Sequence, residues 1–191
     1  SPPPRDKANQ QFIWNGLASG LFTVFSSDHA PFNIDGPDGK RVAGDDASFD
    51  RIPNGIPGVE TRMPLLMSEG VLAGRIDVHR FVELTATNPA RMYGLYPKKG
   101  TIAVGGDADF VVWDVFEAGC EKIIANDMLH HAADYTPYEG MRLRAWPGVT
   151  VSRGRVVWQD GVFSAEPGSG QFQPCLRPRT PNAGSPLDKW L

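Results

Sequence analysis

The chain has 191 residues and a mass of 20.8 kDa, and its 19 basic and 22 acidic side chains give a formal charge of -3. This balance excludes the basic patch that binding to nucleic acid or to an anionic membrane requires. No apolar stretch approaches the roughly 18 residues of a membrane span, so we expect a soluble chain with no membrane partner. The two cysteines, Cys120 and Cys175, lie far apart in the sequence, which excludes a disulfide scaffold and favours a cytoplasmic location.

The chain begins with Ser1 followed by three prolines and has no initiating methionine. We therefore expect a carboxy-terminal fragment of a longer protein. Its 21 glycines and 17 prolines predict a chain rich in loops.

The first third of the chain has the pattern of a helix, a buried strand and a long loop. Asp6 is placed to cap a helix that ends by Gly20. The apolar residues 21–26 predict a strand buried on both faces. Residues 30–58 show little periodicity and predict a long loop of the kind that compact domains keep for function.

Helical patterns follow the loop. Residues 59–69 and 77–85 each predict a helix, and a third helix is predicted from Asn88 to Gly94. Asn88 would cap this third helix, with Pro89 at its first position.

From residue 100 onward, short apolar runs alternate with turn residues and predict a β-rich module. Strands are predicted over residues 110–113, 149–151 and 156–158. The Asp160-Gly161 pair is typical of a type I′ hairpin turn, which leads here into residues 162–163.

Residues 26–32, SSDHAPF, place an acidic and an imidazole group directly after the predicted buried strand. In a β/α barrel, catalytic residues lie at the carboxyl ends of the strands. Asp28 could bind a metal ion there or act as a general base, or it could simply cap the following turn.

Five sequence blocks resemble the carboxy-terminal part of the cyclic amidohydrolases, in particular the dihydropyrimidinase and D-hydantoinase group. In chain order they are SPPPRDK, SSDHAPF, IPNGIPGVETRMPLL, TNPARMYGLYPKKGTIAVGGDADFVVWD and YTPYEGM. Dihydroorotases and allantoinases share blocks like the second and third, whereas SPPPRDK and YTPYEGM are more similar to hydantoinases. Ala30, where hydantoinases commonly carry cysteine, is similar to the dihydroorotases and leaves the substrate within the family open.

The resemblance implies a metal-dependent (β/α)8 barrel with a binuclear zinc site. In the family, the ligands are a His-x-His pair, a carboxylated lysine, two further histidines and one aspartate, and only the aspartate, Asp28, lies in this chain. There it binds the more exposed zinc and passes a proton from the bridging hydroxide to the leaving ring nitrogen. We therefore expect the isolated chain to be inactive.

Further site residues follow from the same resemblance. Main-chain groups of Ser1 and Asn54 would hold a cyclic ureide or imide substrate, although Asn54-Gly55 taken alone would be an ordinary turn. His29 is expected to pack or hydrogen-bond behind the metal site in support of Asp28.

Other polar residues have plainer interpretations. His130 and His131 point in different directions because they are adjacent, which predicts a structural role or a subunit contact. Glu60 and Arg62 could form an ion pair near the long loop.

The resemblance implies hydrolysis of dihydropyrimidines or 5-substituted hydantoins to N-carbamoyl amino acids by the parent protein. A dihydroorotase-like or allantoinase-like activity is one alternative, and a non-catalytic dihydropyrimidinase-related scaffold is another. The scaffold proteins typically replace the residues at the positions of Asp28 and Asn54, so the presence of both favours the enzyme. A free-standing β-rich binding module would not explain the strand, loop and helices before residue 98.

The predicted fold class is α/β, the carboxy-terminal portion of a (β/α)8 metal-dependent hydrolase barrel followed by part of a small β-sandwich domain. Residues 1–97 are assigned to the last βα units and the linking helices, residues 98–172 to the sandwich, and residues 173–191 to a proline-rich tail, extended or disordered. In the family, the sandwich takes further strands from the amino-terminal part, so its edges would be unpaired in this chain. The resemblance also implies a homotetramer of the full-length protein.

Overall fold

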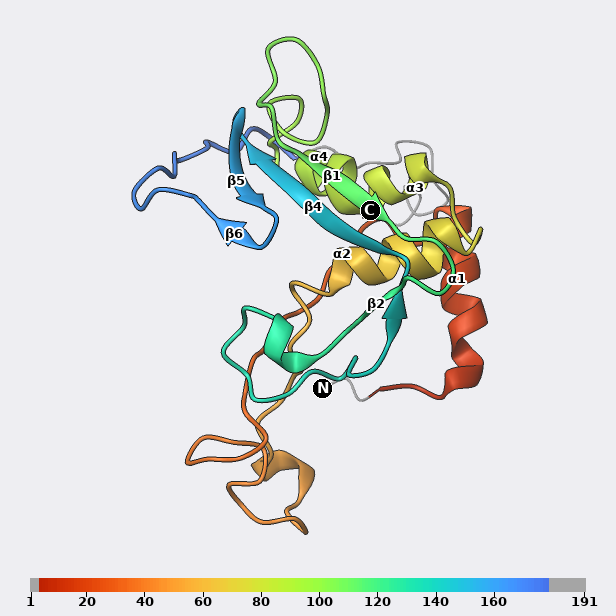
Figure 1. The fold of residues 1–191 in the computed structure, drawn as a ribbon, viewed down its shortest axis with the longest axis vertical. Coiled ribbons are helices and arrows are strands. Elements are labelled where there is room, and N and C mark those ends of the chain that lie inside the picture. The colour runs from red at the N-terminus through yellow and green to blue at the C-terminus, as the bar shows by residue number, and fades with distance from the viewer. Residues whose placement is uncertain (1–3, 179–191) are drawn as a thin grey trace.

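The computed structural model describes residues 4–178, in which helices pack along an antiparallel sheet and a long loop extends away from both (Figure 1). Helix α1, Gln10–Ser19, follows the short 3-10 turn η1, Lys7–Asn9. Asp6 caps this turn through its Oδ1 atom, which accepts the Ala8 N–H at 2.7 Å. Gly20 ends the helix with φ of 86°. The predicted capping role of Asp6 is therefore confirmed for the turn that leads into α1, and the predicted end at Gly20 is confirmed for α1.

The prediction of a buried strand over residues 21–26 is wrong for the described part of the chain. The segment is extended, but it pairs with no described strand, and Leu21 and Ser26 are exposed. A strand needs a neighbour to satisfy its backbone, whereas the apolar pattern reports only which side chains favour burial.

Helices supply the hydrogen bonds that a neighbouring strand would otherwise give to this segment. Three side chains donate to its carbonyl oxygens: Arg80 to Phe22, Asn88 to Thr23 at 2.9 Å, and Arg62 to Phe25 at 2.8 Å. Residues that are far away in the sequence therefore hold this segment in place.

The predicted helix over residues 59–69 is present but begins later and runs further. Helix α2, Arg62–Leu65, continues without a break as the π-helical segment η3, Leu66–Leu72. The predicted start is replaced by a turn, since residues 59–61 precede the first helical residue.

The two predicted helices between residues 77 and 94 are one continuous helix. Its parts are α3, Val78–Val82, the π-helical segment η4, Glu83–Thr87, and α4, Asn88–Met92. Asp77 caps the helix by accepting the Arg80 N–H at 2.7 Å. The prediction that Asn88 caps a separate helix is wrong, because its backbone is helical and its buried amide binds the Thr23 carbonyl.

Pro89 ends the wide turn inside this helix. The Asn88 N–H donates to the Glu83 carbonyl, five residues back. The next donor in that pattern would be residue 89, but proline has no N–H for the Leu84 carbonyl. That carbonyl instead accepts the Phe25 N–H at 3.0 Å. The interruption in the helix therefore provides an acceptor for the extended segment.

The predicted strands are confirmed in an antiparallel sheet with the order β1-β4-β5-β6. The strands are β1, Phe110–Val115, β4, Ala145–Ser152, β5, Arg155–Gln159, and β6, Val162–Phe163. Asp160 and Gly161 have φ of 50° and 81°, as the predicted type I′ turn requires. A separate pair joins β2, Lys122–Ile123, to β3, Arg142–Leu143. Short 3-10 turns cover η2, Phe49–Arg51, and η5, Asn126–Met128.

Two apolar clusters hold the elements together. The first joins the helices to the sheet, and its buried members are Leu17, Leu66, Met67, Ile76, Phe81, Leu84 and Ala145. Phe81 also meets Trp113 of β1 edge to face, with ring centroids 5.8 Å apart. The second cluster includes residues of β3 and β4, and its buried members are Ile124, Leu129, Leu143 and Trp146.

The tail and the cysteines complete the fold. Residues 173–178 form neither helix nor strand, and the Leu176 N–H donates to the Gly94 carbonyl at 2.8 Å. Residues 179–191 lie outside the described residues, and the domain boundaries at 97 and 172 stay predictions. Cys120 and Cys175 are free and exposed. Between residues 4 and 178, no helix combines the length and apolarity that a membrane crossing needs.

The bond from Asn88 to the extended segment predicts a stability effect. Asn88 is 2% exposed, so Asn88→Ala should lower the free energy of unfolding by about 1–3 kcal/mol, because the Thr23 carbonyl loses its donor. Denaturant unfolding measures this. The matched control is Asn15→Ala on the exposed face of α1, expected to change stability by less than about 0.5 kcal/mol. Equal losses in both variants would contradict the assignment.

Candidate active site

Asp28 lies at the end of the extended segment in an unusual backbone conformation. Its φ is 46°, a left-handed value that aspartate tolerates better than most residues with side chains. The residue is exposed, and no described group donates a hydrogen bond to its carboxyl oxygens. Both oxygens are therefore available to bind a cation or to exchange a proton.

His29 is held by the backbone at the start of the α2 region. Its Nδ1 atom accepts the N–H groups of Gly58 at 3.0 Å and Val59 at 3.3 Å. In the neutral ring the proton then lies on Nε2. These contacts tie the residue after Asp28 to residues 58–59, and the supporting role expected for His29 stays a prediction.

The Asp28 segment and the Asn54 segment run side by side. His29 forms a parallel bridge with Ile56, and the Ala30 N–H donates to the Ile56 carbonyl at 3.1 Å. The two residues with predicted roles, Asp28 and Asn54, therefore lie on paired segments, although 26 positions separate them in the sequence.

Glycine is required at position 55 for two reasons. Its φ is +92°, and a Cβ atom there would lie 2.4 Å from the Ala30 Cβ. The close approach of the two segments thus depends on the missing side chain.

Lys40 braces the loop on either side of Asn54. Its Nζ atom donates to the Pro53 carbonyl at 2.8 Å and to the Gly55 carbonyl at 2.6 Å. Asn54 itself is exposed, and its main-chain N–H and carbonyl bond to no described residue. The predicted contact group is therefore held from its flanks and left open.

The remaining predictions have separate outcomes. Ser1 lies outside the described residues, so its predicted substrate contact is not placed. The predicted pair of Glu60 and Arg62 is wrong, because each has another partner. Arg62 binds the Phe25 carbonyl, and burial lowers the pKa of its guanidinium below the usual value. Glu60 binds His130.

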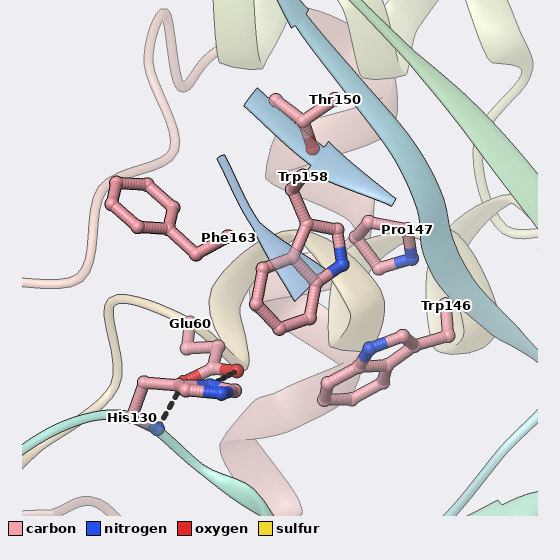
Figure 2. A pocket seen from close by; sticks show the side chains of 7 residues that line it. All are labelled: Glu60, His130, Trp146, Pro147, Thr150, Trp158 and Phe163. Atoms are coloured by element: carbon pink, nitrogen blue, oxygen red, sulfur yellow. Dashed lines mark hydrogen bonds and ion pairs between the residues drawn. The ribbon is translucent and has the colours of Figure 1, made fainter. Parts of the chain in front are cut away.

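Glu60 and His130 border an apolar groove of about 490 Å³ over β4, β5 and β6 (Figure 2). The Glu60 carboxylate accepts the His130 backbone N–H at 2.7 Å and lies 3.0 Å from its Nδ1. The His130 ring also meets Trp158 edge to face at 5.0 Å. Trp146, Pro147, Thr150 and Phe163 complete the lining. These contacts give His130 a structural role.

The described site residues supply one ligand that suits a metal ion. The free carboxyl group of Asp28 is a suitable oxygen ligand for zinc. Within residues 4–178, no cluster of three or more His, Cys, Asp or Glu side chains is placed to hold a metal ion. The described residues therefore contribute a ligand and do not by themselves form the complete site.

Fold and site together define an α/β protein with a carboxyl group presented at the end of an extended segment beside an open main-chain loop. The chain belongs to the amidohydrolase family, whose profile matches residues 7–157.

Similar proteins include D-hydantoinase from Rhizobium radiobacter, 42% identical over 91% of this chain and 36% of that protein. The structure of D-hydantoinase (dihydropyrimidinase) from Thermus sp. has a TM-score of 0.81 with 43% identity, covering 90% of this chain and 36% of that one. L-Hydantoinase (dihydropyrimidinase) from Arthrobacter aurescens has a TM-score of 0.76 with 31% identity, over 87% and 35%. The chain thus spans little more than a third of the length of these relatives.

The contact between Gly55 and Ala30 predicts a local effect that backbone strain alone would not cause. Gly55→Ala should separate the paired segments and speed hydrogen exchange of the Ala30 amide, which donates to Ile56. Gly44→Ala is the matched control, because Gly44 has the same φ of +92° but nothing within 4 Å of its Cβ position. Both variants should cost about 1–2 kcal/mol of backbone strain, yet only the first should alter exchange at Ala30. Unchanged exchange in Gly55→Ala would refute the close contact.

Proposed function

We propose that the full-length protein hydrolyses the cyclic amide bond of dihydropyrimidines or 5-substituted hydantoins and releases N-carbamoyl amino acids. The observation that carries this proposal is the free Asp28 carboxyl group beside the open Asn54 loop. The hydantoinase names of the relatives support the choice of substrate class.

We further propose a binuclear zinc site in which Asp28 is one ligand. Zinc ions there would lower the pKa of a bound water and polarise the ring carbonyl. The other ligands, including a carboxylated lysine, would come from outside this chain, and the isolated chain would be inactive. The support is the family membership together with the donor chemistry of Asp28.

Asp28 would act on a proton. Its exposed carboxyl oxygen can accept a proton during attack on the ring carbonyl and donate it to the leaving ring nitrogen, which would otherwise depart as an unstable anion. The left-handed backbone at Asp28 and the anchored ring of His29 limit the positions that this oxygen can take.

Asn54 would bind the ring edge through its main chain. A cyclic ureide presents N–H and carbonyl groups side by side, and the unbonded carbonyl and N–H of Asn54 can pair with such an edge. Ser1 is proposed to contribute in the same way. Main-chain hydrogen bonds would recognise the ring itself and leave the exocyclic substituent free to vary.

The wider architecture is also a proposal. Residues 1–97 would complete a (β/α)8 barrel and residues 98–172 a small β-sandwich in a cytoplasmic homotetramer. The likeness to hydantoinase structures and the four-stranded sheet support the two domains. The tetramer and the cytoplasmic location rest on the resemblance alone.

The assigned role of Asp28 predicts a loss of turnover without a loss of fold. In the zinc-loaded full-length protein, Asp28→Asn should reduce hydantoin opening by at least about a thousandfold, because the amide cannot relay a proton. The melting temperature should stay close to that of the wild type. Hydantoin, dihydrouracil, dihydroorotate and allantoin should be assayed in parallel.

The control is Asp38→Asn, which neutralises an exposed carboxylate on the same loop and should leave turnover unchanged. Substantial ring opening by fully metal-loaded Asp28→Asn would contradict the proposed role of Asp28 in proton transfer. Faster turnover of dihydroorotate or allantoin than of hydantoin would show that the substrate is that of the dihydroorotases or the allantoinases.

A further inference from the structure

We infer that Asp134 is a positioning residue for the candidate active site and that it acts on the Asn54 loop through residues 33–35. This inference rests on the proposed function. It concerns a carboxylate that neither the metal nor the substrate would touch.

Asp134 makes a reciprocal contact with the chain that follows the SSDHAPF block. Its Oδ1 accepts the Ile34 N–H at 2.8 Å, and its Oδ2 accepts the Asp35 N–H at 3.3 Å. In return, the Asp134 N–H donates to the Asn33 side-chain oxygen at 3.1 Å. One carboxylate thus captures two successive backbone N–H groups across about a hundred residues of sequence.

The contact reaches Asn54 in two further steps. The carbonyls of Asn33 and Ile34 accept the N–H groups of Lys40 at 2.9 Å and Arg41 at 3.0 Å. The Lys40 side chain then holds the Pro53 and Gly55 carbonyls. Asp134 therefore fixes the base of the turn from which Lys40 reaches the residues that flank Asn54.

The segment that carries Asp134 is itself anchored. His130 is held by Glu60, and the His131 ring lies edge-on to His29 at 6.2 Å. The His131 Nδ1 accepts the Ala133 N–H at 3.1 Å, which fixes the turn before Asp134. A carboxylate on so constrained a segment can impose its position on the loop.

The Asp28 segment has further anchors that the Asn54 loop lacks. Residues 23 and 25, before Asp28, are also bonded by Arg62, Asn88 and the Leu84 carbonyl. Loss of the Asp134 contact should therefore disturb substrate binding at Asn54 more than proton transfer at Asp28.

The charged form of Asp134 is the form that makes the contact. The Ile34 N–H, and after it the Asp35 N–H, lower the pKa of this carboxyl below its usual value. A lowered pKa means that the contact stabilises the fold above the unfolded pKa of about 3.9 and is lost as pH falls through the folded value. The nearby charges on the loop, Asp35 and Arg41, pair with each other at 3.5 Å. The contact is thus intact at neutral pH.

The test uses Asp134→Asn in the full-length, zinc-loaded protein, with two readouts. Hydrogen exchange should speed about tenfold at the Ile34 amide, the Asp35 amide or both, because the amide side chain has one acceptor oxygen in place of two. In hydantoin hydrolysis, KM should rise about tenfold while kcat stays within about twofold.

Two further variants keep the test decisive. Asn33→Ala removes the reciprocal bond and leaves the carboxylate intact, so it should shift both readouts in the same direction by a smaller factor even if Asp134→Asn folds poorly. Asp127→Asn neutralises an exposed carboxylate on the same segment and should change neither readout.

The outcomes distinguish a failure of this inference from a failure of the proposed function. Unchanged hydrogen exchange at both the Ile34 and the Asp35 amide in Asp134→Asn overturns the contact. Faster exchange with an unchanged KM overturns the positioning role, and so does a fall in kcat as large as the rise in KM. A wild-type protein that opens no ring overturns the proposed function, whereas an active wild type with unresponsive variants overturns this inference alone.

Discussion

The site depends on how a short extended segment satisfies its backbone without a neighbouring strand among residues 4–178. Its carbonyls are bonded by side chains of two helices, and the Phe25 N–H is bonded by a carbonyl that Pro89 leaves unpaired in the helix. Buried backbone groups without partners are costly, so these bonds decide where the segment can lie. The position of Asp28 follows, since only two residues separate it from Arg62's acceptor at Phe25.

The second half of the candidate site is the loop around Asn54. The loop around Asn54 meets the Asp28 segment at one parallel bridge and at the contact between Gly55 and Ala30. Lysine and carboxylate side chains supply its support, in place of an apolar core. Polar braces of this kind hold a loop in one conformation and still leave its outward main-chain groups available to a ligand.

Local sequence signals predicted local structure well. Asp160-Gly161 predicted its turn because positive φ at both positions is an intrinsic property of that pair. The prediction for Asn88 is wrong because a side chain that can cap a helix can also reach a distant carbonyl. Here the Asn88 amide is buried and binds the Thr23 carbonyl. Asp28 and Asn54 were predicted as site residues from sequence blocks, and their roles stay predictions, whereas Lys40 and Asp134 carry no periodic or motif signal. The side-chain contacts on which their proposed roles rest join residues between 13 and 101 positions apart.

The contacts that assemble the site also determine when it can form during folding. Glu60 pairs with His130 across 70 positions and Ile34 with Asp134 across 100, whereas the β4-β5 hairpin closes over a few residues. Closing long loops costs chain entropy before any bond repays it, so local hairpins and helices are expected to form first. The paired segments of the site would order last in folding.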